Sequence, residues 1–124
     1  MKSWFAIVLV ALIGGFASPS FALASPELAP QDEQRIQSLI GAVEQTAGAV
    51  FIRNGTTYDA KVAARFLRLK WQANSSKVHS AEEFIREIGT RSGTSGDAYR
   101  VKLPDGTELE SAQFLQSLLK RLRG

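Results

Sequence analysis

Basic and aromatic side chains are concentrated in the middle of the 124-residue sequence, where their spacing suits the binding of a negatively charged group. A guanidinium group binds a carboxylate or a phosphate through two parallel hydrogen bonds. Arg65 and Arg68 are three residues apart, so a helix would place both on one face. The sequence therefore predicts a site for an anion, with candidate ligand-binding residues Arg53, Asn54, Tyr58, Arg65, Arg68 and Lys70.

A simpler interpretation of the same residues is a solvated polar stripe. In that case Arg53 or Arg68 would pair with Asp59 or with a glutamate at the surface. Lys70 stands among apolar neighbours, and its long side chain is expected to carry the ammonium group to the surface. A buried Lys70 would instead indicate a function. The sequence leaves both interpretations open.

A second polar segment, residues 93–96, is rich in glycine and serine and lies between Arg91 and Arg100. Its backbone N–H groups could bind an anion, which adds Ser95 and the nearby Tyr99 to the candidate ligand-binding residues. The alternative is a plain flexible connector. The serine does not have the G-x-S-x-G spacing of a nucleophile elbow, and no strand precedes it. We therefore expect no catalytic serine here.

Residues suited to acid–base or metal chemistry are few. The single histidine, His79, precedes a predicted helix cap at Ser80, where a solvent-facing or staple-like role is expected. Glu82 and Glu83 are adjacent, so a helix would point them about 100° apart. A hydrolase with paired carboxylates would instead require Asp59 and Glu83 to meet in space. We predict no catalytic residue, no metal site and no cofactor.

The helix expected to carry the basic residues follows an Asn-Gly pair, which marks a turn because both residues tolerate positive φ. Thr56 and Asp59 have the spacing of a capping box, so the helix is predicted to begin near Thr57. It is apolar around most of its circumference and carries only a narrow polar stripe. We therefore expect it to be the central core helix, covered on more than one side.

Hydrophobic periodicity predicts the remaining elements. Their order gives an α+β fold class, with about four helices around a small two- to three-stranded antiparallel sheet. Pairing the strand at 50–52 with the strand at 99–103 would bury both. The expected segments are a first helix with Ile36, Leu39, Ile40 and Val43 buried and Gly48 at its end, a strand at 50–52, a helix with Phe84, Ile85 and Ile88 buried, a strand at 99–103, a return strand at 107–109, and a last helix with Phe114, Leu115, Leu118, Leu119 and Leu122 on one side.

The N-terminus has the three parts of a secretory signal peptide: a basic Lys2, an apolar run at 4–17, and the Ala22-Leu23-Ala24 cleavage pattern. The apolar run is shorter than the roughly 20 residues of a spanning helix, which argues against an uncleaved anchor. We predict a signal peptide at 1–24 cleaved after Ala24, a flexible lead-in at 25–30, and a single domain at 31–124.

Charge and cysteine content narrow the partners and the compartment. The net charge is only +3, and export argues further against a nucleic-acid ligand. The chain has no cysteine, so an exported domain must be held together by packing alone, which fits a bacterial periplasm. After cleavage, no stable membrane anchor is expected.

Four blocks of residues occur in one order over nearly the whole of the chain after the predicted cleavage site: Phe51-x-Arg53-Asn54-Gly55-x-x-Tyr58, Ala64-x-x-Leu67-Arg68-x-Lys70, Ala81-Glu82-x-Phe84-Ile85 and Ser92-x-x-Ser95-Gly96-x-x-Tyr99. Together they resemble the YfeK-like family of small exported bacterial proteins. The resemblance implies a periplasmic protein with a domain of unknown function, and it assigns no role to any residue. Cysteines associated with some members are missing here, so disulfide chemistry cannot be required.

These observations predict a periplasmic, non-enzymatic binding or interaction protein for an envelope ligand or a protein partner. Its basic and aromatic residues would hold an anionic group. The alternative is a small cell-envelope hydrolase that uses paired carboxylates. A single concave pocket lined by Arg53, Tyr58, Arg68 and Tyr99 would favour the binding function.

Overall fold

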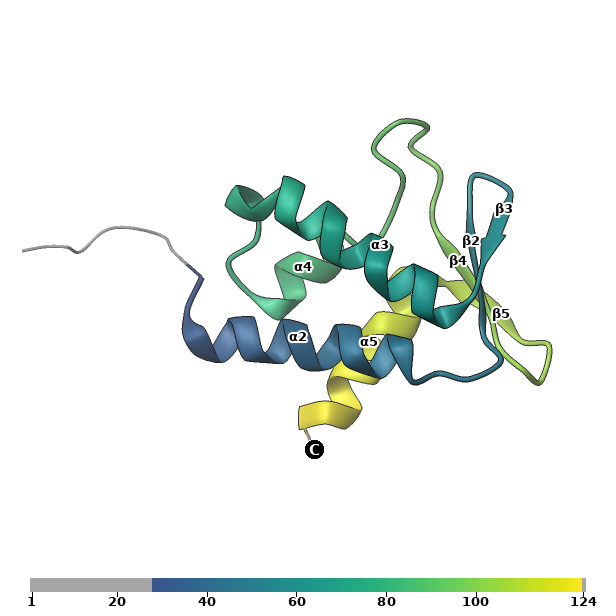
Figure 1. Cartoon of the computed structure of the whole chain (residues 1–124), viewed down its shortest axis with the longest axis horizontal. Helices are drawn as coiled ribbons and strands as arrows, with labels where there is room; N and C mark the ends of the chain where they lie inside the picture. The colour runs from purple at the N-terminus through teal and green to yellow at the C-terminus, as the bar shows by residue number, and fades with distance from the viewer. Residues whose placement is uncertain (1–27, 124) are drawn as a thin grey trace, which may run out of the picture.

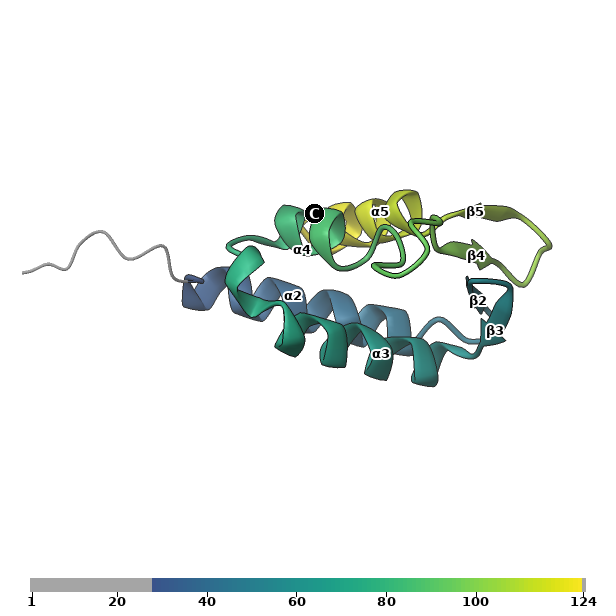
Figure 2. The ribbon, with the colours of Figure 1, turned by 90° about the horizontal axis from the view of Figure 1, so that it is seen from above.

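Helices and strands occupy opposite ends of the molecule in the computed structural model, which describes residues 28–123 (Figure 1). The predicted signal peptide and residues 25–27 of the predicted lead-in lie outside this range; Leu28 packs against the core. Seen from above, α2 lies beside α3 in one layer, and α4 lies beside α5 in the other (Figure 2). The described elements are α2 (Pro30–Glu44), β2 (Val50–Arg53), β3 (Thr56–Tyr58), α3 (Ala60–Ala73), a 3-10 turn (Ser75–Lys77), α4 (Ala81–Glu87), β4 (Arg100–Lys102), β5 (Glu108–Glu110) and α5 (Ser111–Arg123).

The sheet has four antiparallel strands in the order β3-β2-β4-β5. This confirms the α+β class and the pairing of the first strand with the strand that follows Tyr99. One row of paired residues crosses all four strands and is at least partly buried: Tyr58, Phe51, Val101 and Leu109. Within this row the Phe51 ring meets Phe114 of α5 edge-on, with 5.8 Å between centroids, so this face of the sheet closes the core.

The fourth strand, β3, was not predicted, and the start of α3 was placed too early. Asn54 and Gly55 have φ values of +52° and +80°, which are the two positive angles of a tight hairpin turn. The chain after the turn therefore pairs with β2 instead of beginning a helix. The helix cap is Asp59, whose Oδ1 accepts from the Val62 N–H at 2.9 Å. The predicted capping box starting at Thr56 is wrong, because the backbone there is extended and paired with Arg53.

The central helix is α2 and not α3. Four side chains of α2 are fully buried, and this helix contacts α3, α4 and α5. One side of α3 packs against α2, and its other apolar side is only half-covered, with Leu69 57% exposed. The prediction that α3 is the central core helix is therefore wrong, although α3 contacts β2 and Phe84 of α4 as well as α2. The fully buried residues of α2 are Ile36, Leu39, Ile40 and Val43.

The two remaining helices follow the predicted pattern with one exception. Ser80 caps α4 by accepting from the Glu83 N–H at 3.1 Å, and Glu83 accepts from the His79 N–H at 2.8 Å. His79 is exposed, as expected. In α5 the predicted apolar face is buried except for Leu122, which is 48% exposed because it lies in the last turn. Over residues 28–123, no helix is long and apolar enough to cross a membrane.

Candidate functional site

Arg53 faces the helices from the end of β2. It is two residues after the buried Phe51, and alternate residues of a strand share a face. Ile52 is paired with Arg100, so the next position of the antiparallel register sets Arg53 opposite Tyr99. The guanidinium carbon of Arg53 lies 4.8 Å from the centre of the Phe66 ring of α3. An arginine is thus held over an aromatic face, an arrangement that stabilises its charge.

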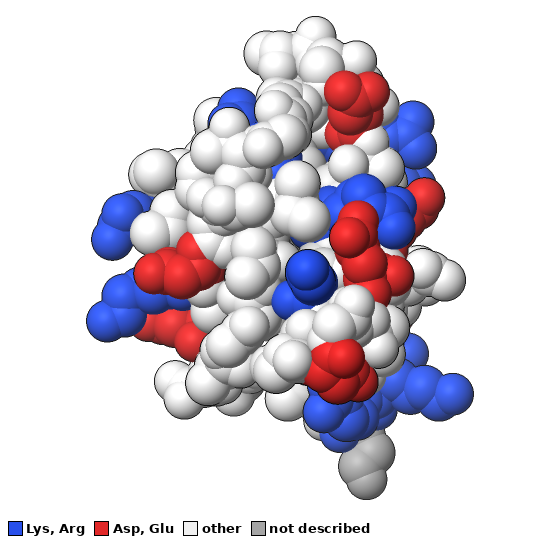
Figure 3. All heavy atoms as spheres, turned by 90° about the vertical axis from the view of Figure 1, so that its right-hand side faces the viewer, with Lys and Arg blue, Asp and Glu red and all other residues white. Residues whose placement is uncertain are grey.

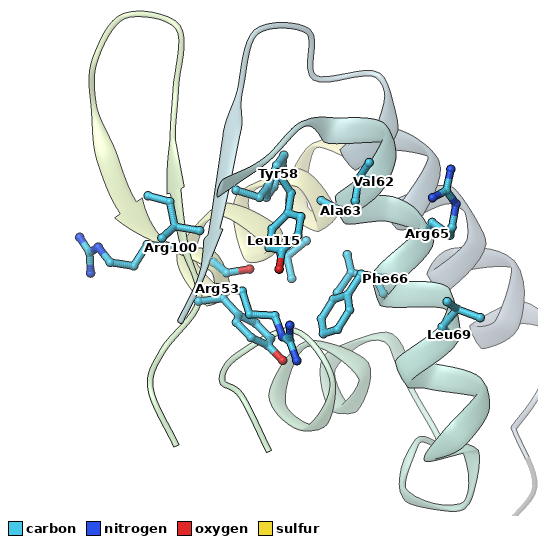
Figure 4. Close-up of a pocket in the computed structure, with 14 residues that line it drawn as sticks. Arg53, Tyr58, Val62, Ala63, Arg65, Phe66, Leu69, Arg100 and Leu115 are labelled. Atoms are coloured by element: carbon cyan, nitrogen blue, oxygen red, sulfur yellow. The ribbon is translucent and has the colours of Figure 1, made fainter. Parts of the chain in front are cut away.

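A cavity of about 290 Å³ opens beside this arginine, between β2, α3 and α5. Figure 4 shows Arg53 and Phe66 directed toward one another, with Leu115 and Tyr58 nearby. The guanidinium groups of Arg65 and Arg100 point away from the cavity in the same view. The walls are mostly apolar, and the lining residues are Phe51, Ile52, Arg53, Tyr58, Val62, Ala63, Arg65, Phe66, Leu67, Leu69, Tyr99, Arg100, Ser111 and Leu115.

The cavity has basic side chains but no acidic ones in its lining. The Nε of Arg53 is buried and has no hydrogen-bond partner. Among residues 28–123, no carboxylate lies within ion-pair distance of Arg53, Arg65 or Lys70, while Arg100 is paired with Glu108 at 2.6 Å. Positive charge at the cavity is therefore left without a protein counter-ion.

Lys70 is joined to the cavity through Tyr99. Its Nζ donates to the Tyr99 hydroxyl at 2.8 Å and to the Arg91 carbonyl at 2.7 Å. Burial lowers the pKa of Lys70, and the nearby charge of Arg53 lowers it further. Burial raises the pKa of Tyr99, and Arg53 partly offsets that rise. Tyr99 is therefore a protonated phenol at neutral pH, which makes it a hydrogen-bond donor and a poor nucleophile.

The glycine- and serine-rich segment is tied to the β2–β3 hairpin beside the cavity. Ser95 Oγ donates to Asn54 Oδ1 at 2.6 Å, and Asn54 Nδ2 donates to Ser92 Oγ at 3.3 Å. The buried Ser92 Oγ also accepts from the N–H groups of Thr94 and Ser95. These N–H groups point at a hydroxyl of their own loop, so the segment is organised by internal hydrogen bonds.

The candidates from the sequence thus fall into three places. Arg53, Tyr58 and Tyr99 line the cavity, Lys70 contacts it through Tyr99, and Arg65 belongs to its rim. Asn54 and Ser95 form the bridge between hairpin and loop.

Arg68 lies apart from the cavity. Its Nη2 is 3.6 Å from a carboxylate oxygen of Glu44 on α2, so Arg65 and Arg68 do not face one ligand.

The apolar walls of the cavity were missed by sequence reasoning. Val62, Phe66 and Leu69 belong to the apolar circumference of α3, and the sequence predicts that other elements cover this circumference. The available signal was the excess apolar circumference of α3, which exceeded what one neighbouring helix can cover.

Most acidic side chains of the described residues belong to separate ion pairs or caps. Asp59 caps α3, and Glu83 belongs to the cap of α4. Glu82 contacts Arg35 and Arg123. Within 28–123, no three His, Asp or Glu residues are grouped so that they could hold a metal ion. On the surface at the sheet end of the molecule, basic and acidic side chains are intermixed (Figure 3).

The fold and the cavity define a class: small α+β domains whose helices and sheet enclose a half-open apolar cavity with an arginine at one end. Residues 30–123 match the model of a family described as Family of unknown function (DUF5329), and the chain belongs to this family.

A relative is the uncharacterized protein YfeK of Salmonella typhimurium (strain LT2), which is 31% identical over 68 residues, or 55% of this chain and 57% of the relative. The resemblance to a YfeK-like family is confirmed. The chain spans about 57% of the length of this curated relative. No solved structure matches.

Proposed function

We propose that the protein is an exported, non-enzymatic binding protein that holds an anionic group of an envelope ligand beside Arg53. One observation carries the proposal: a guanidinium group faces an apolar cavity and has no acidic partner among the described residues. Export to the periplasm rests on the basic, apolar and Ala-x-Ala parts of residues 1–24.

The guanidinium group of Arg53 is half-buried, and its partial removal from water is unfavourable. Removing a guanidinium group from water costs free energy unless hydrogen bonds or an opposite charge replace the lost hydration. The Phe66 ring replaces part of the hydration that Arg53 loses, whereas Arg53 Nε has no hydrogen-bond partner. A carboxylate or phosphate in the cavity would accept from Arg53, and the Tyr99 hydroxyl could donate to the same group. The ligand would thus complete a site that the protein leaves short of negative charge.

The hydrolase alternative finds less support. It needs two carboxylates in one cleft, and the residues that line the cavity include none. Asp59 and Glu83, the pair considered from the sequence, cap two different helices. The raised pKa of Tyr99 makes its phenolate scarce at neutral pH, so this tyrosine does not replace a carboxylate as nucleophile.

The test compares anions with neutral molecules of the same shape. The full-length chain is expressed in a bacterial host, purified from the periplasmic fraction, and its N-terminus is determined by mass spectrometry. Benzoate and benzamide, and phenyl phosphate and phenol, are then titrated by NMR. The anions are expected to shift resonances of Arg53, Phe66 and Tyr99, and the neutral molecules are expected to bind at least about tenfold more weakly.

Arg53→Gln should weaken binding of the anions by about 10- to 100-fold, because a charge-assisted hydrogen bond contributes about 1.5 to 3 kcal/mol. Arg86→Gln is the matched control, since Arg86 is exposed on α4 and pairs with Glu83 and Glu87. Equal affinity of benzoate for both variants would exclude Arg53 as the binding residue. A chain recovered with residues 1–24 still attached would exclude cleavage after Ala24.

A further inference from the structure

The cavity has two chemically different ends. Arg53 and the Tyr99 hydroxyl mark the polar end, near Phe66. At the other end the walls are Val62 and the Tyr58 ring, and Figure 4 shows Leu115 between the two ends. A ligand that filled this space would therefore have its charge at one end only.

One wall of the cavity is an apolar stripe of α3 that no other element fully covers. Val62, Phe66 and Leu69 follow one another at helical spacing, and the first two are only half-buried. Leu69, at the rim, is 57% exposed. The opposite side of the helix packs on α2, whereas this stripe meets the core only where the Phe66 ring packs edge-on against Tyr99. An apolar ligand that covered this exposed apolar surface would gain binding free energy by removing the surface from water.

The volume limits the size of what fits. At roughly 30 Å³ for each non-hydrogen atom, as for water in the liquid, a cavity of about 290 Å³ holds about ten such atoms. Octanoate has about this size, because its eight carbons include the carboxylate carbon and its two oxygens bring the total to about ten non-hydrogen atoms. A longer chain would extend past Tyr58 into solvent or across the surface.

We propose that the ligand is a single-chain amphiphile, an unbranched alkyl chain with an anionic head. The head contacts Arg53, and the chain lies along Val62 and Phe66 toward Tyr58. The proposal rests on the proposed function, because it takes the anionic group from there and adds the alkyl chain. A carboxylate and a phosphate head share this chemistry, so a fatty acid and a lysophospholipid fragment are both included.

The test measures how affinity depends on chain length. Acetate, butanoate, hexanoate, octanoate and decanoate are titrated calorimetrically into the full-length chain as the host processes it, below micellar concentrations. Affinity should rise about threefold for each added methylene, because a buried methylene contributes slightly less than about 0.8 kcal/mol in a half-open site. The rise should stop near octanoate, when the cavity is full. Octyl phosphate tests whether a phosphate head binds more tightly than the carboxylate head of octanoate. Octanol is the uncharged control.

A pair of valine variants locates the chain. Val62→Thr places a hydroxyl group on the wall along which the chain lies and should weaken octanoate binding by about three- to tenfold while leaving acetate unchanged. Val50→Thr is the matched control, because Val50 is also partly exposed and lies outside the cavity. Both positions are partly exposed, so both variants should fold, which urea unfolding will check.

The outcomes separate this inference from the function beneath it. Acetate binding as tightly as octanoate would overturn the alkyl chain and leave an anion site at Arg53. Octanol binding as tightly as octanoate would overturn the anionic head and the proposed function with it. Absence of binding by every compound would overturn both. A rise with chain length that Val62→Thr reduces and Val50→Thr does not would support the amphiphile.

Discussion

The two apolar sides of α3 have similar composition and opposite environments. On the buried side, which packs on α2, Ala64 is fully buried, Leu67 is 6% exposed, and the Trp71 ring meets Phe84 of α4 edge-on with 5.7 Å between centroids. On the side facing β2, the larger Phe66 lines a cavity in place of a closed core. Residue size therefore does not separate the two sides, whereas burial does: Leu67 and Trp71 belong to the core, and Leu69 stays in water at the rim of the cavity.

The largest expected effect is on the free energy of unfolding, which should differ between a buried and an exposed leucine of α3. Leu67→Ala should lower the free energy of unfolding by about 3 kcal/mol, because a buried leucine is replaced by a cavity in the core. Leu69→Ala, the same change on the cavity side, should cost less than about 0.5 kcal/mol, since that side chain is already largely hydrated. Urea unfolding followed by circular dichroism measures both. Similar losses in the two variants would show that the cavity side is packed as tightly as the other.

A smaller effect on stability is expected at Lys70, which joins α3 to Arg91 and Tyr99. Lys70→Met should lower the free energy of unfolding by about 1 kcal/mol at neutral pH, because the Arg91 carbonyl and the Tyr99 hydroxyl lose a hydrogen-bond donor. Lys61→Met, at an exposed position of the same helix, controls for the change in net charge.

The same variant has a predicted dependence on pH. The pKa of Lys70 is lowered in the folded protein from its ordinary value of 10.5, so the unfolded chain binds more protons between these two values. The free energy of unfolding contributed by Lys70 therefore rises as the pH approaches 10.5. The advantage of the wild type over Lys70→Met should grow as the pH rises above neutral toward 10.5. An advantage that shrinks over this interval would contradict the burial of Lys70.

The smallest effect concerns the bridge between hairpin and loop. Ser95→Ala removes the donor to Asn54 Oδ1, and should cost about 0.5 kcal/mol because the bond is exposed. Hydrogen exchange at residues 92–97 should become faster, since the loop would lose its tie to the turn at Asn54. Ser76→Ala, at an exposed position far from the hairpin in sequence, is the control. Unchanged exchange in Ser95→Ala would show that the other hydrogen bonds of the loop, such as that from Asn54 Nδ2 to Ser92 Oγ, hold it without this one.

Local signals in the sequence were sufficient for most of the fold. Ser80 and Glu83 occur at capping spacing, and both take part in the cap of α4. The strand β3 was missed because Thr56 and Asp59 offered a competing helix signal over the same residues. The hairpin prevailed because it gives the backbone of Thr56–Tyr58 partners on β2, which an isolated first turn of helix would lack.

The candidate site depended on information that local patterns do not contain. Arg53 and Tyr99 are opposite one another because of the register between β2 and β4, and the sequence predicted that pairing without its register. Arg68 contacts Glu44 because α2 and α3 lie side by side, a long-range packing that spacing within α3 could not indicate. Composition identified the residue types for an anion site, and topology selected which of them share a cavity.

The edge strands of the sheet affect whether neighbouring molecules associate at high protein concentration. A long, apolar, unpaired edge would allow strands of neighbouring molecules to add on and build fibrils. Here the outer strands, β3 and β5, have three residues each, and β5 carries a carboxylate at both ends, on Glu108 and Glu110. The carboxylates make the β5 edge repel copies of itself, and the β3 edge is short, so the sheet resists growth from one molecule to the next.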